Sequence, residues 1–125
     1  MDKVVHFEIP VKDPMKAERF YSGVFGWKIS AVPNMEYWMA QTAKTDEKKM
    51  MVMEPGAING GIMKHDGPLK HHVITVAVKD IDEAARKIKE MGGKMVKDKA
   101  MVMNMGWTAY FEDPEGNVIG LWQVM

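Results

Sequence analysis

The sequence predicts an α+β protein built from two tandem βαβββ modules, in which each module forms a cupped, mixed sheet. Two observations lead to this fold class. A strand, a capped helix and a second strand occur near the start of the chain, and the same elements recur 67 residues later. Each copy then ends in two more strand-like segments. We expect one domain over 1–125, with modules at about 3–65 and 71–124.

The first copy begins with residues 4–11 (VVHFEIPV), whose alternation of side chains is typical of a strand. Asp13-Pro14 follows as a helix N-cap and a first helical residue. The next stretch carries apolar residues at helical spacing and ends at Gly26, which predicts an amphipathic helix. Strands are predicted after it over 27–32, 36–42 and 57–63, with a polar loop at 43–49.

The second copy repeats these signals at a constant offset. Residues 73–78 (VITVAV) predict a strand, Asp80 is an N-cap, and Gly93 follows the helix as Gly26 follows the first. Six identities fall at the single offset of 67, which favours an internal duplication. Further strands are predicted from Lys94, over 107–111 and over 118–123.

Strand register predicts which side chains face a ligand. The apolar set of the first strand should face the helix, which leaves His6 and Glu8 on the concave face. The same register places His71 and Thr75 on the concave face of the second module. Aromatic and Met side chains on the later strands suit a ligand cavity, and equally suit a filled core. The candidate ligand-binding residues are Trp38, Met63, His71, Thr75, Trp107, Phe111 and Trp122, and the candidate catalytic residues are His6 and Glu8.

Composition excludes several classes of protein. The 17 basic and 17 acidic residues balance, so no nucleic acid or membrane is expected as a partner. There is no cysteine, which rules out disulfides and thiolate chemistry. The N-terminal residues do not resemble a signal peptide, and a cytoplasmic location is expected. The 14 methionines suit either flexible core filling or an adaptable pocket lining.

Three segments together resemble the vicinal oxygen chelate superfamily, which includes glyoxalase I, bleomycin-resistance proteins and extradiol dioxygenases. They are HFEIPVKDPMKAERFYSGVFGWKI, INGGIMKHDG and GWTAYFEDPEGNVIGLWQ. The resemblance covers nearly the whole chain. It implies paired βαβββ modules, a ligand cavity, commonly a homodimer and, in many members, a divalent metal ion held by His and Glu or Gln.

The resemblance also points to four ligand positions. The first falls on His6, which has a suitable donor. Two others fall on Val73 and Gly120, which have none, and the fourth falls near 61–63, where no carboxylate or amide stands. His6 is therefore the only matched ligand position, and no cofactor is expected. An alternative site of His6, Glu8 and His71 would suit nickel, iron or zinc.

Two functions follow as hypotheses. The first is a small-molecule-binding protein of the bleomycin-resistance type, with aromatic side chains around the ligand and without the metal. The alternative is an enzyme, either a glyoxalase-like lyase related to lactoylglutathione lyase or a dioxygenase-like protein, acting on a small oxygenated metabolite. The expected partners are a small molecule and a second copy of the chain, because the open sheet edges need cover.

Overall fold

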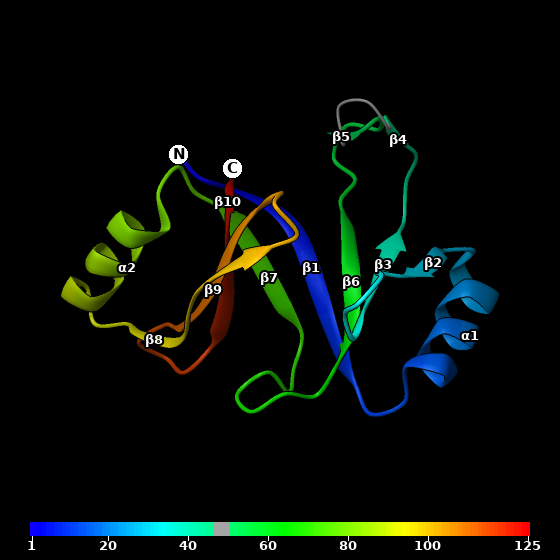
Figure 1. Ribbon diagram of the computed structural model, residues 1–125, viewed down its shortest axis with the longest axis horizontal. Helices are drawn as coiled ribbons and strands as arrows, with labels where there is room; N and C mark the ends of the chain where they lie inside the picture. Colours follow the sequence, from blue (N-terminus) through cyan, green and yellow to red (C-terminus); the bar gives the residue numbers. More distant parts are fainter. Residues whose placement is uncertain (47–50) are drawn as a thin grey trace. The chain divides into compact units, whose positions relative to one another are not determined.

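The computed structural model describes residues 1–46 and 51–125, which fall into two compact units (Figure 1). We call His6–His72 the first module, and Val73–Met125 together with Met1–Val5 the second module. The predicted α+β class is confirmed, because each module has one helix and a mixed four-stranded sheet in βαβββ order. That the two modules act as one domain stays a prediction.

The first module has the strand order β2-β3-β6-β1. Its first and last strands, β1 and β6, run parallel, and the other pairs are antiparallel. A short antiparallel pair follows β3: β4 lies within the predicted polar loop and β5 lies after it, and residues 47–49 of the loop lie outside the described residues. The bounds are β1 (Lys3–Val11), α1 (Pro14–Phe25), β2 (Lys28–Ala31), β3 (Tyr37–Gln41), β4 (Thr45–Asp46), β5 (Met51–Val52) and β6 (Asn59–Lys64).

Helix α1 begins and ends as its sequence predicts. The Asp13 side chain accepts a hydrogen bond from the Lys16 backbone N–H at 3.2 Å, which caps the N-terminus. Gly26 ends the helix in the left-handed conformation, at φ 72°. Ring contacts then join the helix to the sheet, because Trp27 lies 5.1 Å from Tyr21 and 5.6 Å from Phe7, centroid to centroid. Phe7 therefore faces the helix, as its register predicts.

The second module has the order β7-β10-β9-β8, and again its first and last strands run parallel. The Asp80 side chain caps α2 by accepting from two backbone N–H groups, at 2.9 and 3.2 Å. Strand β8 continues through two irregularities well beyond the predicted start at Lys94. The bounds are β7 (Val73–Ala77), α2 (Ile81–Glu90), β8 (Lys94–Val102), β9 (Gly106–Glu112) and β10 (Val118–Val124).

The core of the second module lies between α2 and one face of its sheet. Ile81, Ala109 and Leu121 are buried at its centre. Partly buried side chains surround them, namely Val76, Val78, Ala84, Ile88, Met95, Trp107 and Phe111. Because β-strand side chains alternate, this face and the opposite face carry different residues of each strand.

Helices α1 and α2 have 12 and 10 residues. In the described ranges, neither is long and apolar enough to cross a bilayer.

Candidate functional site

The first module joins His6 of β1 to Tyr37 of β3 by a hydrogen bond. The Tyr37 hydroxyl lies 2.7 Å from Nε2 of His6, and the two rings are nearly parallel. Burial lowers the pKa of His6 below its usual value, and the nearby carboxylate of Glu8 opposes that shift. The imidazole is therefore neutral near pH 7, so one of its nitrogens is a proton acceptor.

Gly61 makes room for this pair. In the parallel ladder Gly61 lies opposite Glu8 of β1, and on its other side it lies opposite Met39 of β3. A Cβ atom at position 61 would collide with the hydroxyl oxygen of Tyr37. The tyrosine hydroxyl thus fills the space above the glycine backbone, where most other residues would place a side chain.

Glu8 is the carboxylate of the site, and only 5% of its surface is exposed. It lies two residues after His6 and therefore on the same face of β1. The register places Pro10, Met63 and Tyr37 on that face too. We call this the Tyr37 face. It brings the predicted residues His6, Glu8 and Met63 together with Tyr37, which the sequence did not single out.

A pocket of about 400 Å³ adjoins the Tyr37 face. Tyr37 and the thioether side chains of Met35 and Met63 line it, and charged side chains stand around them. One pair of these charges is joined, because Lys64 Nζ lies 3.5 Å from a carboxylate oxygen of Glu36. The full lining is Met35, Glu36, Tyr37, Met63, Lys64, His65 and Asp66.

The second module repeats part of this construction. Thr75, of which 6% is exposed, lies opposite Gly120 in the parallel ladder. A Cβ atom at position 120 would lie 2.8 Å from Oγ1 of Thr75 and 3.4 Å from Cε1 of Tyr110. Trp122 shares the Thr75 face, because it lies opposite Ala77. Val73 is buried at the start of the strand and has no donor atom.

The other predicted ligand-binding residues lie elsewhere. Trp38 is opposite Ile62, on the sheet face turned away from Tyr37. Trp107 and Phe111 pack in the core under α2, on the face opposite Thr75. His71 is exposed, next to the end of the first module. Tyr37 and Trp38 lie on opposite faces of β3 because side chains alternate along a strand. The pairing of β3 with β6 decides which of the two lies beside His6, and the sequence alone did not give that pairing.

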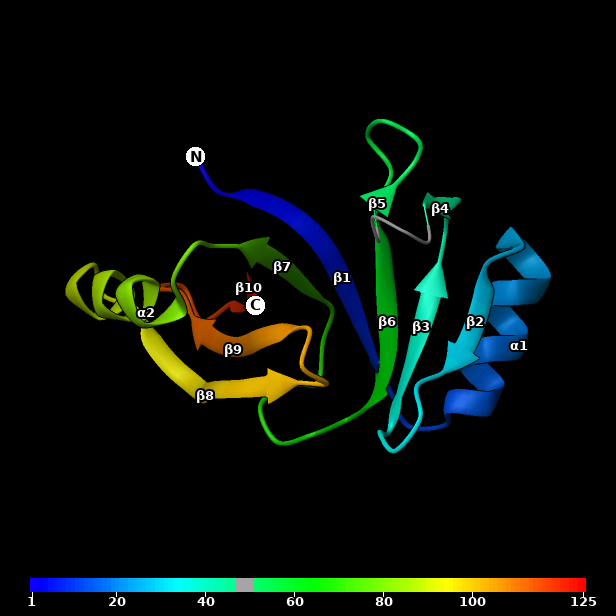
Figure 2. The ribbon, with the colours of Figure 1, turned by 45° about the horizontal axis from the view of Figure 1, so that its top comes forward.

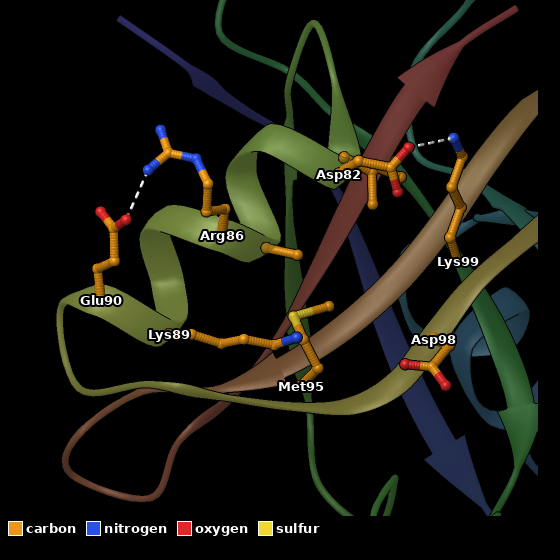
Figure 3. A pocket seen from close by; sticks show the side chains of 9 residues that line it. Asp82, Arg86, Lys89, Glu90, Met95, Asp98 and Lys99 are labelled. Atoms are coloured by element: carbon orange, nitrogen blue, oxygen red, sulfur yellow. Dashed lines mark hydrogen bonds and ion pairs between the residues drawn. The ribbon is translucent and has the colours of Figure 1, made fainter.

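A larger hollow, of about 520 Å³, lies between α2 and β8 (Figure 3). Its charges are mostly paired: Arg86 bonds Glu90 at 2.6 Å, and Lys99 bonds Asp82 at 3.0 Å. Arg86 also bonds Glu83, and that bond holds the pKa of the Glu83 carboxyl below its usual value. These exposed pairs indicate a solvated groove. We therefore place the candidate site at Tyr37, where a buried carboxylate and a desolvated imidazole lie together.

A divalent ion does not fit the residues present. Nε2 of His6 is already hydrogen-bonded to Tyr37, and the hydroxyl occupies the space above Gly61. Val73 and Gly120 offer no donor. Within 1–46 and 51–125, no group of three or more His, Asp or Glu side chains is placed to hold an ion, including the predicted alternative of His6, Glu8 and His71. Whether the protein binds a metal stays a prediction.

Comparisons with known proteins cover nearly the whole chain. A family model described as "Glyoxalase/Bleomycin resistance protein/Dioxygenase superfamily" matches residues 3–121. Lactoylglutathione lyase of Escherichia coli O157:H7 is 29% identical over 124 residues, with 95% of this chain and 90% of that protein covered. The anthracycline biosynthesis protein DauV of Streptomyces sp. (strain C5) is 23% identical over 124 residues, with 94% and 45% covered. The chain thus spans less than half the length of DauV.

Solved structures support the same fold. A superfamily member from Vibrio splendidus 12B01 superposes with a TM-score of 0.61 at 14% identity, and the match covers 100% of both chains.

Proposed function

Because the chain belongs to the glyoxalase/bleomycin resistance protein/dioxygenase superfamily, we propose that it binds a small organic molecule at the Tyr37 face of the first module. The bond between His6 and Tyr37 carries this proposal. It holds a phenol and a neutral imidazole in fixed positions next to a pocket, and such preorganised polar groups give a site its specificity.

The lining of the pocket indicates the kind of ligand. The ring of Tyr37 offers a flat aromatic surface, and Met35 and Met63 offer flexible, polarisable side chains that adapt to an apolar body. Lys64 and Asp66 stand at the same pocket and can meet polar substituents. We infer a small, partly flat molecule that carries at least one oxygen atom. Neither stacking nor hydrogen bonding of this kind requires a metal ion.

A matched pair of variants tests this site. A library of small aromatic and oxygenated compounds is screened by thermal shift, since a ligand that prefers the native state raises the melting temperature. Tyr37→Phe removes only the hydroxyl group, and Tyr21→Phe makes the same change in α1. For each compound that stabilises the protein, we expect Tyr37→Phe to bind it at least tenfold more weakly than the wild type does. Tyr21→Phe should bind it with the affinity of the wild type. Equal effects of the two variants would contradict the proposal.

A lyase is the second candidate function. It is supported by the 29% identity with a lactoylglutathione lyase, of which the chain covers 90%. The test is isomerisation of the hemithioacetal of methylglyoxal and glutathione, with and without added nickel, zinc or manganese. Turnover that His6→Gln abolishes would favour the lyase. If a compound binds at Tyr37 and no turnover occurs, either with or without added metal, the result supports a binding function and not a lyase.

We also propose a homodimer. Helix α1 exposes several large apolar side chains, at 56% for Phe20, 58% for Val24 and 60% for Phe25, and β2 is an open edge of its own sheet. Light scattering at micromolar concentration should give twice the chain mass of 14.2 kDa. A single chain mass there would contradict the dimer.

A further inference from the structure

Four exposed methionines gather at one end of the sheet of the second module. Met101 lies near the end of β8, Met103 and Met105 lie in the turn that leads into β9, and Met125 follows β10. The exposed fractions are 48%, 51%, 44% and 59% in that order. Single exposed apolar side chains are common on protein surfaces, whereas several gathered at one place can mark a binding site.

Backbone pairing brings these residues together. The turn visible between β8 and β9 in Figure 2 is closed by the Met105 N–H, which donates to the Val102 carbonyl at 2.8 Å. The Met125 N–H donates to the Met105 carbonyl at 3.1 Å, which continues the ladder of β9 and β10 by one step. Met101 lies opposite Trp107, two residues after Met105. Met105 and Met125 are therefore direct neighbours in the ladder, and Met101 and Met103 belong to the hairpin that contains Met105.

The turn itself has an unusual residue. Met103 has φ 46° and Asn104 has φ 57°, both in the left-handed region. Asn is common in the left-handed region. In methionine this conformation causes steric strain that glycine, which has no Cβ atom, would avoid. Positive φ at both central residues is what a two-residue type I′ hairpin turn requires, so the turn itself accounts for this conformation.

Chemistry narrows what such a cluster can bind. Thioether sulfur is a soft, neutral donor that selects soft ions such as Cu(I), and it is a poor ligand for magnesium or calcium. The chain has no cysteine to compete for such an ion. Lys99, which lies over the Trp107 ring at 4.7 Å, is paired with Asp82 at 3.0 Å.

We propose that Met101, Met103, Met105 and Met125 form a binding site for a soft monovalent metal ion of the Cu(I) class. Facing residues of an antiparallel pair have Cα atoms roughly 4.5–5.5 Å apart, and methionine has three rotatable bonds. Met105 and Met125 are such a facing pair, so their two sulfur atoms can reach one ion, and Met101 and Met103 lie on the same β8–β9 hairpin. The site is separate from the Tyr37 face, and it does not depend on the function proposed there.

Silver(I) is the probe, because it shares the soft character of Cu(I) and is stable in air. The full chain is titrated with Ag(I) by calorimetry, and the methionine methyl groups are followed by NMR. We expect one ion per chain and shifts in the four named methyl signals. Tyr37→Phe should bind Ag(I) as the wild type does. Cu(I), titrated without oxygen against a chromogenic chelator, should compete with Ag(I) for the same site.

Two triple variants make the test decisive. Met101→Leu/Met103→Leu/Met105→Leu removes three sulfur atoms at nearly constant volume, and Leu for Met is a tolerated exchange. The control, Met15→Leu/Met53→Leu/Met91→Leu, removes three methionines that are 69%, 63% and 80% exposed and lie in α1, after β5 and after α2. We expect at least a tenfold rise in Kd for the first and none for the control. Absence of saturable binding, equal losses in both, or shifts spread over all exposed methionines would overturn the proposal.

Discussion

Glu8 and Thr75 occupy equivalent positions in the two modules. They stand 67 residues apart, the offset of the predicted repeat, and each lies opposite a glycine in the parallel last strand of its own module. Among the described residues they are also the buried polar side chains, at 5% and 6% exposure. Each module therefore carries a buried polar side chain at this position. Only the first module pairs it with a histidine, because Val73 stands where His6 would be.

Replacing Gly61 with alanine should displace Tyr37. The new Cβ atom would overlap the tyrosine hydroxyl, so the ring or the backbone must move, and overpacking of this kind costs about 1–3 kcal/mol. Denaturant unfolding of Gly61→Ala measures the loss. The control is Gly23→Ala in α1, where a Cβ meets nothing within 4 Å. That variant should be as stable as the wild type or slightly more stable. A fully stable Gly61→Ala would show that Tyr37 does not occupy this space.

Removing the Tyr37 hydroxyl should lower stability modestly. Tyr37→Phe deletes the bond to Nε2 of His6, and one such bond contributes about 0.5–1.5 kcal/mol net. Chemical denaturation gives the change, and Tyr21→Phe is the matched control. Losses that do not differ between the two variants would show that the bond contributes nothing to stability.

The stability of the protein should fall in mild acid because of His6. Burial makes the folded-state pKa of His6 lower than its unfolded value near 6.5, so below that pH the unfolded chain binds more protons. The contribution of His6 is thus complete above pH 6.5 and is lost as the pH falls toward the lowered pKa. His6→Gln should show a flatter profile of unfolding free energy between pH 7.5 and 5.5. If the wild type and His6→Gln lost unfolding free energy equally over this pH range, His6 would not be the cause of the loss.

Asn59 should be a strong determinant of stability in the first module. Its side-chain oxygen accepts from the backbone N–H groups of Thr42 and Ala43, at 2.8 and 3.1 Å, and its nitrogen donates to the Thr45 hydroxyl at 2.9 Å. Asn59→Ala leaves these partly buried groups without this partner, which should cost about 2–3 kcal/mol. Asn59→Asp keeps the acceptor and loses the donor, so its loss should be smaller. Equal losses would show that the accepting bonds are unimportant.

The sequence predicted both helices because these depend on local signals. Asp13, Gly26 and Asp80 cap the helices as expected. The alternation of β1 likewise placed His6 and Glu8 on one face and Phe7 on the other, since a half-buried strand fixes its own register.

The later strands were harder, because aromatic residues occupy both of their faces. Trp38 and Tyr37 are neighbours, and only the pairing with Ile62 and Met63 decides which of them lies beside His6. Trp107 and Phe111 lie under α2 for a similar reason, since Ala109 between them is the residue that packs at the centre of the core. The face that each of these aromatic side chains occupies depends on pairing between distant strands. Local periodicity in the sequence does not contain that information.

The parallel pairing of first and last strands has a consequence for how the chain folds. In the first module it joins His6 to Asn59, and in the second it joins Thr75 to Gly120, so each pairing closes a long loop. Closing such a loop costs more entropy than forming a hairpin, and contacts of this kind slow folding. We expect the β8–β9–β10 meander to form early in refolding and the β1–β6 and β7–β10 ladders to form late. His6 and Tyr37 would then meet only when the first module closes.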